Sequence, residues 1–215
     1  YGGRNIVENL DFEVPSGQVT AIIGPNGCGK STLLRGFSRL LKPAGGRVRL
    51  DSKDVSKYGS RDFARRVGLL PQHPIAPDGI TVADLVSRGR YPYQGMFSKA
   101  SREDDAAVAW ALEATHTEQL ADQPVAELSG GQRQRVWIAM SLAQETDVLL
   151  LDEPTTYLDL AHQVDLLDLV VRLNRSRGTT MLLVLHELNL AARCADHLVA
   201  MKAVSYTHLR AHETG

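Results

Sequence analysis

The sequence predicts an α/β fold in which a mostly parallel sheet is covered by helices on both faces. Three short runs, Gln18–Gly24, Asp147–Asp152 and Thr179–His186, are almost wholly apolar, as strands are when both faces of their sheet are buried. Between them lie segments whose apolar residues recur at helical spacing. Alternating strands and helices of this kind indicate a parallel sheet in the core.

The first predicted strand leads through a glycine-rich loop into a helix. Gln18–Gly24, "QVTAIIG", is rich in β-branched residues and ends at a glycine. The segment after the loop, which Pro43 ends, carries four apolar residues on one helical face: Leu33, Leu34, Phe37 and Leu41. We therefore expect a strand, a loop and a helix in direct succession.

A second helix and a small β-layer complete the predicted core. The helix carries Val164, Leu167 and Val171 on one stripe and ends at Gly178. The segments Asn5–Val14 and Gly46–Asp51 alternate apolar and polar residues, as half-exposed antiparallel strands do. We expect them to form a layer beside the main sheet.

The pattern changes to helices between residues 81 and 135. One of these helices is predicted over Ser101–Thr115, where Ser101 and Asp104 form a capping box. We expect residues 1–80 and 136–203 to form the core with its β-layer, and residues 81–135 to form an inserted helical lobe.

Composition excludes several classes of protein. With 43% hydrophobic and 23% charged residues among 215, the chain is globular. A net charge of −1 gives no general attraction to nucleic acid, which we do not expect as a partner. No apolar run could span a bilayer and no signal peptide opens the chain, so a soluble cytosolic protein is expected. Cys194 and His197 form only a C-x-x-H fragment, for which a helix surface is a better interpretation than a metal site.

The loop after the first strand has the pattern G-x-x-x-x-G-K-S followed by threonine. Amides of such a loop wrap phosphates at a helix amino terminus, Lys30 adds positive charge near the β- and γ-phosphates, and the Ser31 hydroxyl can bind Mg²⁺. For Cys28, small size in the loop is favoured over thiol chemistry. The predicted phosphate-binding residues are Gly24, Pro25, Asn26, Gly27, Cys28, Gly29, Lys30, Ser31 and Thr32.

Acidic residues close the buried strand Asp147–Asp152. Asp152 is placed to hold the magnesium shell, and the adjacent Glu153 to orient or deprotonate water. His186 closes the next apolar strand, where it could bind the γ-phosphate or the attacking water. A lone histidine at a strand end is more often structural.

Six motifs together resemble the ATP-binding subunit of an ABC transporter. In family order they are "GPNGCGKST", "LLPQ", "LSGGQ", "LLLDEP", "TYLD" and "LHE", and the resemblance covers Tyr1 to about Lys202. It implies a P-loop NTPase fold with a RecA-like core and hydrolysis of MgATP. It also implies that Tyr1 stacks on adenine, that Gln72 touches magnesium and signals to the membrane subunit, and that Asp159 is the aspartate of the "TYLD" motif.

The same resemblance gives the second glycine loop a use. In this family two subunits pack head to tail, and the signature "LSGGQ" of one closes over the ATP of the other. Here Ser129, Gly130, Gly131 and Gln132 precede a predicted amphipathic helix that carries Val136, Ala139, Met140 and Ala143 on one face. A glycine-softened helix amino terminus suits an anion, which agrees with the homodimer that the resemblance implies.

A finer resemblance concerns the transported substance. Residues 81–95, 128–146 and 149–163 are close to the ATPases of iron-siderophore and iron-dicitrate importers, although Glu187 stands where that subfamily more usually has aspartate. The resemblance implies permease subunits in the membrane, a periplasmic or lipoprotein substrate-binding protein, and a place on the cytoplasmic face of a bacterial membrane. Tyr91, Tyr93 and Phe97 fit either a permease dock or packing within the lobe.

Three alternatives remain beside ferric-chelate import. Importers of heme or cobalamin are close cousins by the same resemblance. A non-transport ABC protein would carry coiled-coil insertions, tandem ATPase domains or a basic face, and we see none in the sequence. A binding-only pseudo-ATPase is disfavoured because Glu153 and His186 are both present.

The end of the chain departs from the family. After Lys202 the family pattern continues with a glycine turn, another strand and helices, whereas this chain continues "AVSYTHLRAHETG". Because Val204–Thr214 resembles the translation of an adaptor used in sequencing libraries, we interpret residues 204–215 as a non-native tail and leave them out of the predicted fold. With its start at Tyr1, the chain reads as a fragment of a longer gene.

Overall fold

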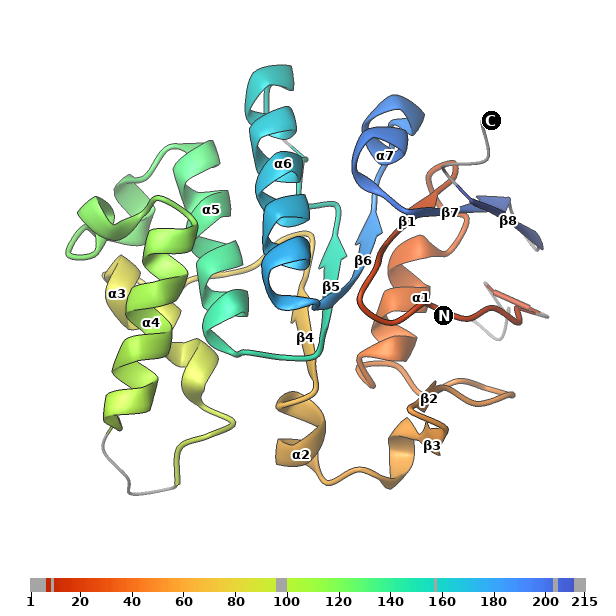
Figure 1. Cartoon of the computed structure of the whole chain (residues 1–215), viewed down its shortest axis with the longest axis horizontal. Coiled ribbons are helices and arrows are strands. Elements are labelled where there is room, and N and C mark those ends of the chain that lie inside the picture. Colours follow the sequence, from red (N-terminus) through yellow and green to blue (C-terminus); the bar gives the residue numbers. More distant parts are fainter. Residues whose placement is uncertain (1–6, 9, 96–99, 157, 203–204, 211–215) are drawn as a thin grey trace.

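A six-stranded sheet in the order β4-β5-β6-β1-β7-β8 forms the centre of the molecule (Figure 1). The computed structural model describes residues 7–8, 10–95, 100–156 and 158–202, and the backbone of 205–210. All neighbouring strands are parallel except β8, which runs antiparallel to β7, so the predicted α/β fold is confirmed. In sheet order the strands are β4 (Val67–Leu70), β5 (Val148–Asp152), β6 (Thr180–Val184), β1 (Val19–Ile23), β7 (His197–Lys202) and β8 (Ser205–Arg210).

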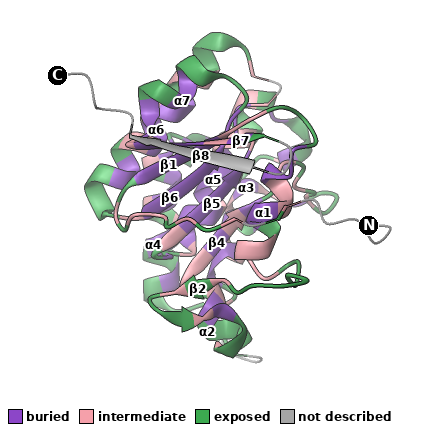
Figure 2. Cartoon of the chain, turned by 90° about the vertical axis from the view of Figure 1, so that its right-hand side faces the viewer, coloured by how far each residue is buried: buried purple, intermediate pink, exposed green. Residues whose placement is uncertain are grey.

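Both faces of the sheet are buried, as its apolar strands predict. Along β5, Leu149 and Leu151 point into one hydrophobic cluster, and Leu150 points into the other. The first cluster includes residues of α5 (Gly130–Ala143), α6 (Leu160–Arg177) and α7 (Leu188–Cys194). The second includes α1 (Lys30–Phe37). Figure 2 shows these strands as mostly buried between the outer helices.

Helices dominate residues 81–135, as predicted. They are α3 (Val82–Ser87), α4 (Arg102–Ala114) and the short 3₁₀ turns Arg88–Arg90, Glu118–Leu120 and Val125–Glu127, and the amino end of α5 follows. Ser101 caps α4, and Asp104 returns the bond to the Ser101 amide at 3.0 Å, so the predicted capping box is confirmed. Among the described residues, no helix is both long and apolar enough to cross a membrane.

The flanking β-layer is smaller than predicted. It consists of β2 (Arg49–Leu50) and β3 (Lys53–Asp54), paired antiparallel, and a 3₁₀ turn (Val55–Lys57) and α2 (Ser60–Ala64) lead from it to β4. The predicted strand Asn5–Val14 is wrong where the structure describes it, because residues 7–8 and 10–14 lie in no strand.

The alternation of apolar and polar residues in that amino-terminal segment reflects which side chains are buried, and the segment belongs to no strand where it is described. Leu10, Phe12 and Val14 are half-buried against the second cluster, and the residues between them are exposed. The ring of Phe12 lies 5.8 Å from that of Phe37 at the end of α1. The period of a strand can therefore follow from burial on one side, in a segment whose described residues belong to no strand.

Helix α1 is also shorter than predicted, because it ends at Phe37. Arg39 has a φ of 63°, which turns the chain out of the helix, and Leu41 is 40% exposed. The guanidinium of Arg39 donates to the carbonyl oxygen of Tyr58 at 3.0 Å and lies 4.9 Å from the ring centroid of Phe63. These contacts hold the turn in place of a further helical turn.

Residues Ser205–Arg210 form β8 along the edge of the sheet. Six residue pairs join β7 to β8. Strand β8 differs from the predicted architecture, in which residues 204–215 had no place. The interpretation of residues 204–215 as non-native concerns their origin and stays a prediction.

Helix α6 ends at Gly178 with a φ of 67°, as predicted, and Asn174 holds its end to the sheet. Asn174 is 6% exposed, and its Nδ2 donates to the carbonyl oxygens of Gly17 at 3.0 Å and Thr179 at 2.7 Å. The first bond connects the end of α6 to the turn that precedes β1.

We predict that Asn174→Ala lowers the stability of the chain by about 1–3 kcal/mol, because it leaves two carbonyl groups without their side-chain donor. The melting temperature should fall by roughly 2–4 °C for each kcal/mol. Thermal unfolding followed by circular dichroism tests this. Arg175→Ala, an exposed change one residue away, is the control. Equal melting temperatures for the two variants would contradict the role given to Asn174.

Candidate functional site

The predicted phosphate loop connects β1 to α1, and its glycines leave part of the backbone uncovered by side chains. A Cβ at Gly24 would lie 2.2 Å from the carbonyl oxygen of Met201 and 3.0 Å from Sγ of Cys28. Gly29 has a φ of 103°, in the region that favours glycine. Cys28 is buried beneath the loop, which fits packing better than thiol chemistry. The exposed residues of the loop are Pro25, Asn26 and Gly27.

The amino end of α1 opens onto this loop. Its N-cap residue, Gly29, offers no side-chain acceptor to the helix amides. Lys30 is 5% exposed, and its Nζ donates to the carbonyl oxygens of Gly24 at 2.8 Å and Pro25 at 3.2 Å. Free amides beside a buried ammonium group attract a phosphate anion, so these residues fit the triphosphate of ATP. Ser31 and Thr32 follow in the first turn of α1.

Ser31 connects the phosphate loop to the acidic end of β5. Its Oγ donates to Oδ1 of Asp152 at 2.8 Å, and Asp152 is buried. Burial raises the pKa of Asp152 above its ordinary value, although the hydrogen bond from Ser31 opposes the shift. A hydroxyl and a carboxylate at this distance are oxygen donors of the kind that Mg²⁺ prefers.

Glu153 joins three further segments through one carboxylate oxygen. Its Oε2 lies 2.7 Å from Nε2 of His186 and 3.2 Å from Oγ1 of Thr156, and it also accepts a hydrogen bond from Nε2 of Gln72. The backbone of Glu153 has a φ of 52°, a left-handed conformation that is uncommon outside glycine and occurs often at functional sites. Sequence reasoning paired Glu153 with water but missed Thr156.

These contacts form because four parallel strands end at one edge of the sheet. Gln72 follows β4, and His186 follows β6. Asp152 is the last residue of β5, and Glu153 comes directly after it. The phosphate loop follows β1, which is the next strand in the sheet. The structure therefore brings the predicted groups of four separate motifs to one carboxyl edge, where ligands of such sheets bind.

The signature residues lie at the amino end of α5, away from this cluster. Oγ of Ser129 accepts the Gln132 amide at 3.2 Å, and Oε1 of Gln132 accepts the Ser129 amide at 3.0 Å, forming a capping box. Ser129, Gly130 and Gln132 are exposed. Among the described residues, no hydrogen bond or ion pair joins Ser129–Gln132 to the phosphate loop. Figure 1 shows α5 and α1 on opposite sides of the sheet.

Asp159 begins α6 close to the signature. Its Oδ1 accepts the amide of His162 at 3.0 Å and lies 2.7 Å from Nδ1 of the same residue. The bond from the His162 amide lowers the pKa of Asp159. A Cβ on Gly131 would lie 3.3 Å from Cδ2 of His162, so the amino ends of α5 and α6 are in contact. His162 carries no motif signal and was missed in the sequence.

Other sequence predictions fall outside this cluster. Tyr1 and Phe97 lie outside the described residues. Tyr91 is 59% exposed, whereas Tyr93 is half-buried within the chain. Cys194 and His197 are both buried, so the expected helix surface is wrong, and burial raises the pKa of the Cys194 thiol to about 11.

Comparisons with known proteins agree with this geometry. The family described as ABC transporter matches residues 7–156. The chain is 57% identical to the achromobactin transport ATP-binding protein of Dickeya dadantii (strain 3937), over 94% of this chain and 75% of that protein. It is also 57% identical to the ferric enterobactin transport ATP-binding protein of Escherichia coli (strain K12), over 94% of this chain and 74% of that protein.

A solved structure shows the same fold. It is the dimer of an ATP-binding cassette in a post-hydrolysis state with ADP and Pi, and it is 25% identical to this chain. The TM-score is 0.82, over 97% of this chain and 92% of that one. This chain belongs to the ABC transporter family. It is an ATPase, as the resemblance of its motifs predicts.

We predict that Asp152→Asn raises the melting temperature of the nucleotide-free chain at pH 7. Because the folded-state pKa of Asp152 is raised, its ionisation costs folding free energy above that pKa, and the cost vanishes below the ordinary value of 3.8. Asparagine keeps an acceptor for Ser31 without the charge. The gain, measured by calorimetry, should shrink as the pH falls toward the ordinary value. No gain at pH 7, or an equal gain from the exposed Asp78→Asn, would contradict this explanation.

Proposed function

We propose that this chain is the ATP-binding subunit of an importer for a ferric siderophore or a similar iron chelate, and that it hydrolyses MgATP as a head-to-tail dimer. The observation that carries the proposal is the meeting of the phosphate loop, Asp152, Glu153 and His186 at one sheet edge, with the signature exposed elsewhere. By name, the two relatives described above are an achromobactin transport ATP-binding protein and a ferric enterobactin transport ATP-binding protein.

The phosphate loop is suited to hold the triphosphate of ATP. In this proposal the backbone N–H groups of the loop Gly24–Thr32, in which Pro25 has none, and the ammonium group of Lys30 bind the phosphates, and Tyr1 stacks on adenine. Ser31, Gln72 and Asp152 hold Mg²⁺, which supplies positive charge that offsets the charge of the phosphates. Among the described residues there is no cluster of three or more His, Cys, Asp or Glu side chains that could form a metal site without the nucleotide.

Glu153 and His186 are suited to the hydrolytic step. The Oε2 atom of Glu153 lies within hydrogen-bonding distance of three donor groups. A water molecule that took the place of one of these groups would be held by the same oxygen. His186 is 40% exposed and can donate toward the γ-phosphate. Gln72 connects this site to the loop after β4. Catalysis then rests on positioning and charge stabilisation, without a covalent intermediate.

The signature is suited to the ATP of a second copy. Its capping box fixes Ser129 and Gln132 at the exposed start of α5, and Asp159 begins α6 beside them. Two helix amino ends that face solvent together can meet an anion on another subunit. The solved cassette with ADP and Pi is a dimer, which supports a dimer of this chain.

Import requires partners beyond this chain. We propose integral-membrane permease subunits, a periplasmic or lipoprotein substrate-binding protein and a place on the cytoplasmic face of the bacterial membrane. Tyr91 is exposed beside Tyr93 and offers an aromatic anchor for the permease. Heme or cobalamin import is the alternative within the same class, and a non-transport ABC ATPase is the alternative outside it.

We predict that Glu153→Gln makes the chain a dimer by light scattering only when ATP is present. Glutamine keeps the volume of the side chain but loses the carboxylate that directs water, so ATP should persist at the interface. Hydrolysis should fall by about two orders of magnitude or more, as on removal of a general base.

Adding Ser129→Arg to Glu153→Gln tests whether the signature makes that dimer. The arginine places a bulky side chain at the start of α5 and leaves the phosphate loop of the same subunit unchanged. ATP should still bind the monomer, and the dimer should disappear. A double variant that dimerises as before would rule out this use of the signature.

We predict that vesicles containing this ATPase, its permease and its binding protein accumulate a ferric siderophore when MgATP is supplied. Uptake of radiolabelled ferric siderophore, heme and cobalamin, measured side by side, separates the three importers. Preferred uptake of heme or cobalamin would replace the proposed substrate, and no uptake of any of the three would favour a non-transport role.

Tyr91→Ala is the control for docking in the same vesicles. It should reduce copurification with the permease and reduce uptake, while ATP binding to the isolated chain stays unchanged because Tyr91 lies outside the phosphate-binding cluster. Unchanged copurification would remove Tyr91 from the permease contact.

A further inference from the structure

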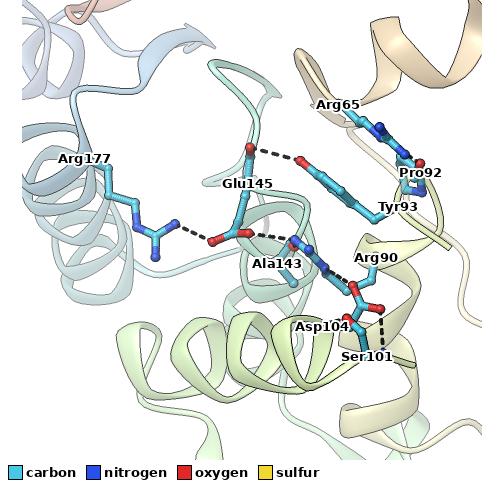
Figure 3. A network of polar contacts seen from close by, with 9 residues as sticks. All are labelled: Arg65, Arg90, Pro92, Tyr93, Ser101, Asp104, Ala143, Glu145 and Arg177. Carbon is cyan, nitrogen blue, oxygen red and sulfur yellow. Dashed lines mark hydrogen bonds and ion pairs between the residues drawn. The ribbon is translucent and has the colours of Figure 1, made fainter. Parts of the chain in front are cut away.

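Arg90, in the 3₁₀ turn after α3, is a buried charge at the boundary between the helical lobe and the core (Figure 3). It donates to three acceptors, each at 2.8 Å: Oδ1 of Asp104, the carbonyl oxygen of Ala143 and Oε2 of Glu145. Asp104 belongs to α4 in the lobe, whereas Ala143 and Glu145 stand at the carboxyl end of α5. One guanidinium therefore holds the end of the signature helix to the lobe.

The charges around Arg90 are arranged to stay ionised. Burial by itself raises the pKa of Asp104, but the hydrogen bonds from Ser101 and Arg90 together lower it below its ordinary value. A buried guanidinium is tolerated only when its donors meet partners of this kind. The planar guanidinium group also fixes the directions of its hydrogen bonds, which a lysine ammonium group would not do.

Glu145 occupies a backbone position where glycine is usual. It follows the C-cap residue of α5 with a φ of 49°, the left-handed conformation in which helices commonly end on glycine. A glutamate there is strained, and its carboxylate is fully used. Oε2 pairs with Arg90, and Oε1 pairs with Arg177 at the end of α6, 3.1 Å away. The side chain thus joins the lobe to a core helix.

Helices α5 and α6 are in contact at both of their ends. At the carboxyl ends the link is Glu145–Arg177, and at the amino ends His162 lies against Gly131. Arg177 also lies 3.4 Å from the ring centroid of Trp110 on α4. Three helices therefore meet at the same carboxylate and its arginine partners.

An aromatic ring covers the outer side of Arg90. The guanidinium lies 4.0 Å from the ring centroid of Tyr93, and that of Arg65 lies 5.0 Å from the same centroid. Nε of Arg65 donates to the carbonyl oxygen of Pro92 at 3.0 Å, and the Tyr93 hydroxyl donates to that of Glu145 at 3.4 Å. Figure 3 shows Arg65, Tyr93, Arg90 and Glu145 as one connected group.

We propose that Arg90 and Glu145 are positioning residues for the signature. Among the described residues they touch no part of the ATP site, and they fix the direction of α5 from its carboxyl end, so that Ser129–Gln132 faces the ATP of the second copy. The inference rests on the proposed head-to-tail dimer.

The length of α5 makes its far end sensitive to this joint. A helix of 14 residues is about 20 Å long, so a tilt of roughly 5° at the carboxyl end moves the signature by about 2 Å. Hydrogen bonds to a phosphate tolerate much less than this, since their usable range of length is about 0.5 Å. Loss of the joint should therefore weaken contact with the partner's ATP before it affects the phosphate loop of the same chain.

The test introduces Glu145→Gln into Glu153→Gln protein, in which ATP-dependent dimers accumulate. Two quantities are measured, which are the ATP affinity of the monomer and the ATP-dependent dimer dissociation constant. We expect monomer affinity to change by less than about twofold and the dimer dissociation constant to rise by about tenfold or more, a scale seen when reacting groups are misplaced.

Glu145→Gly and Asp168→Asn separate positioning from stability. Glycine relieves the left-handed backbone and removes the carboxylate, so the melting temperature should stay near that of the parent while dimerisation is lost. Asp168 pairs with Arg193 on the exposed side of α6, and its loss should leave dimerisation unchanged.

Three results would count against the inference. Normal dimerisation of Glu145→Gln and Glu145→Gly would overturn it, and so would a parallel loss of monomer ATP affinity and dimerisation, which indicates general damage. Absence of ATP-dependent dimers in the Glu153→Gln parent would instead overturn the proposed dimer, and the inference with it.

Discussion

The structure depends on a sheet whose parallel strands are buried on both faces. Alternate residues of β5, such as Leu149 and Leu150, enter two different hydrophobic clusters, so neither face has room for charge. Polar functional groups can therefore be placed only at the ends of the strands. The carboxyl ends of β4, β5, β6 and β1 are neighbours, and four separate segments of the chain therefore meet in one cluster around Asp152 and Glu153.

Much of this architecture could be predicted because its signals are local. Apolar runs marked β1, β5 and β6, and the helical stripe with Gly178 marked α6. The failures occurred where tertiary contacts override a local pattern. Leu41 has helical spacing, but Arg39 turns the chain out of the helix to reach Tyr58. The alternation at Leu10, Phe12 and Val14 reflects contact with α1 instead of strand pairing.

Some residues of the candidate site could be predicted from the sequence, whereas the residues that are proposed to position it could not. Motif residues such as Ser31 and Glu153 could be found because phosphate and water chemistry restrict both residue type and spacing. The Arg90–Glu145 pair could not be found in this way, because the two residues are 55 positions apart and neither belongs to one of the six short motifs. Its one sequence signal is negative. The position after α5, where many helices have glycine, holds a glutamate.

The proposed dimer would explain why a chain with one phosphate loop carries a second glycine-rich loop far from it. The capping box of Ser129 and Gln132 lies at the exposed start of α5, and contacts at both ends of α5 and α6 hold α5 in place. If Arg90 sets that direction, the chain cannot fold its own signature onto its own ATP without breaking the three hydrogen bonds that the buried Arg90 side chain donates. The same joint that stabilises the monomer would then make the proposed active site depend on a second copy.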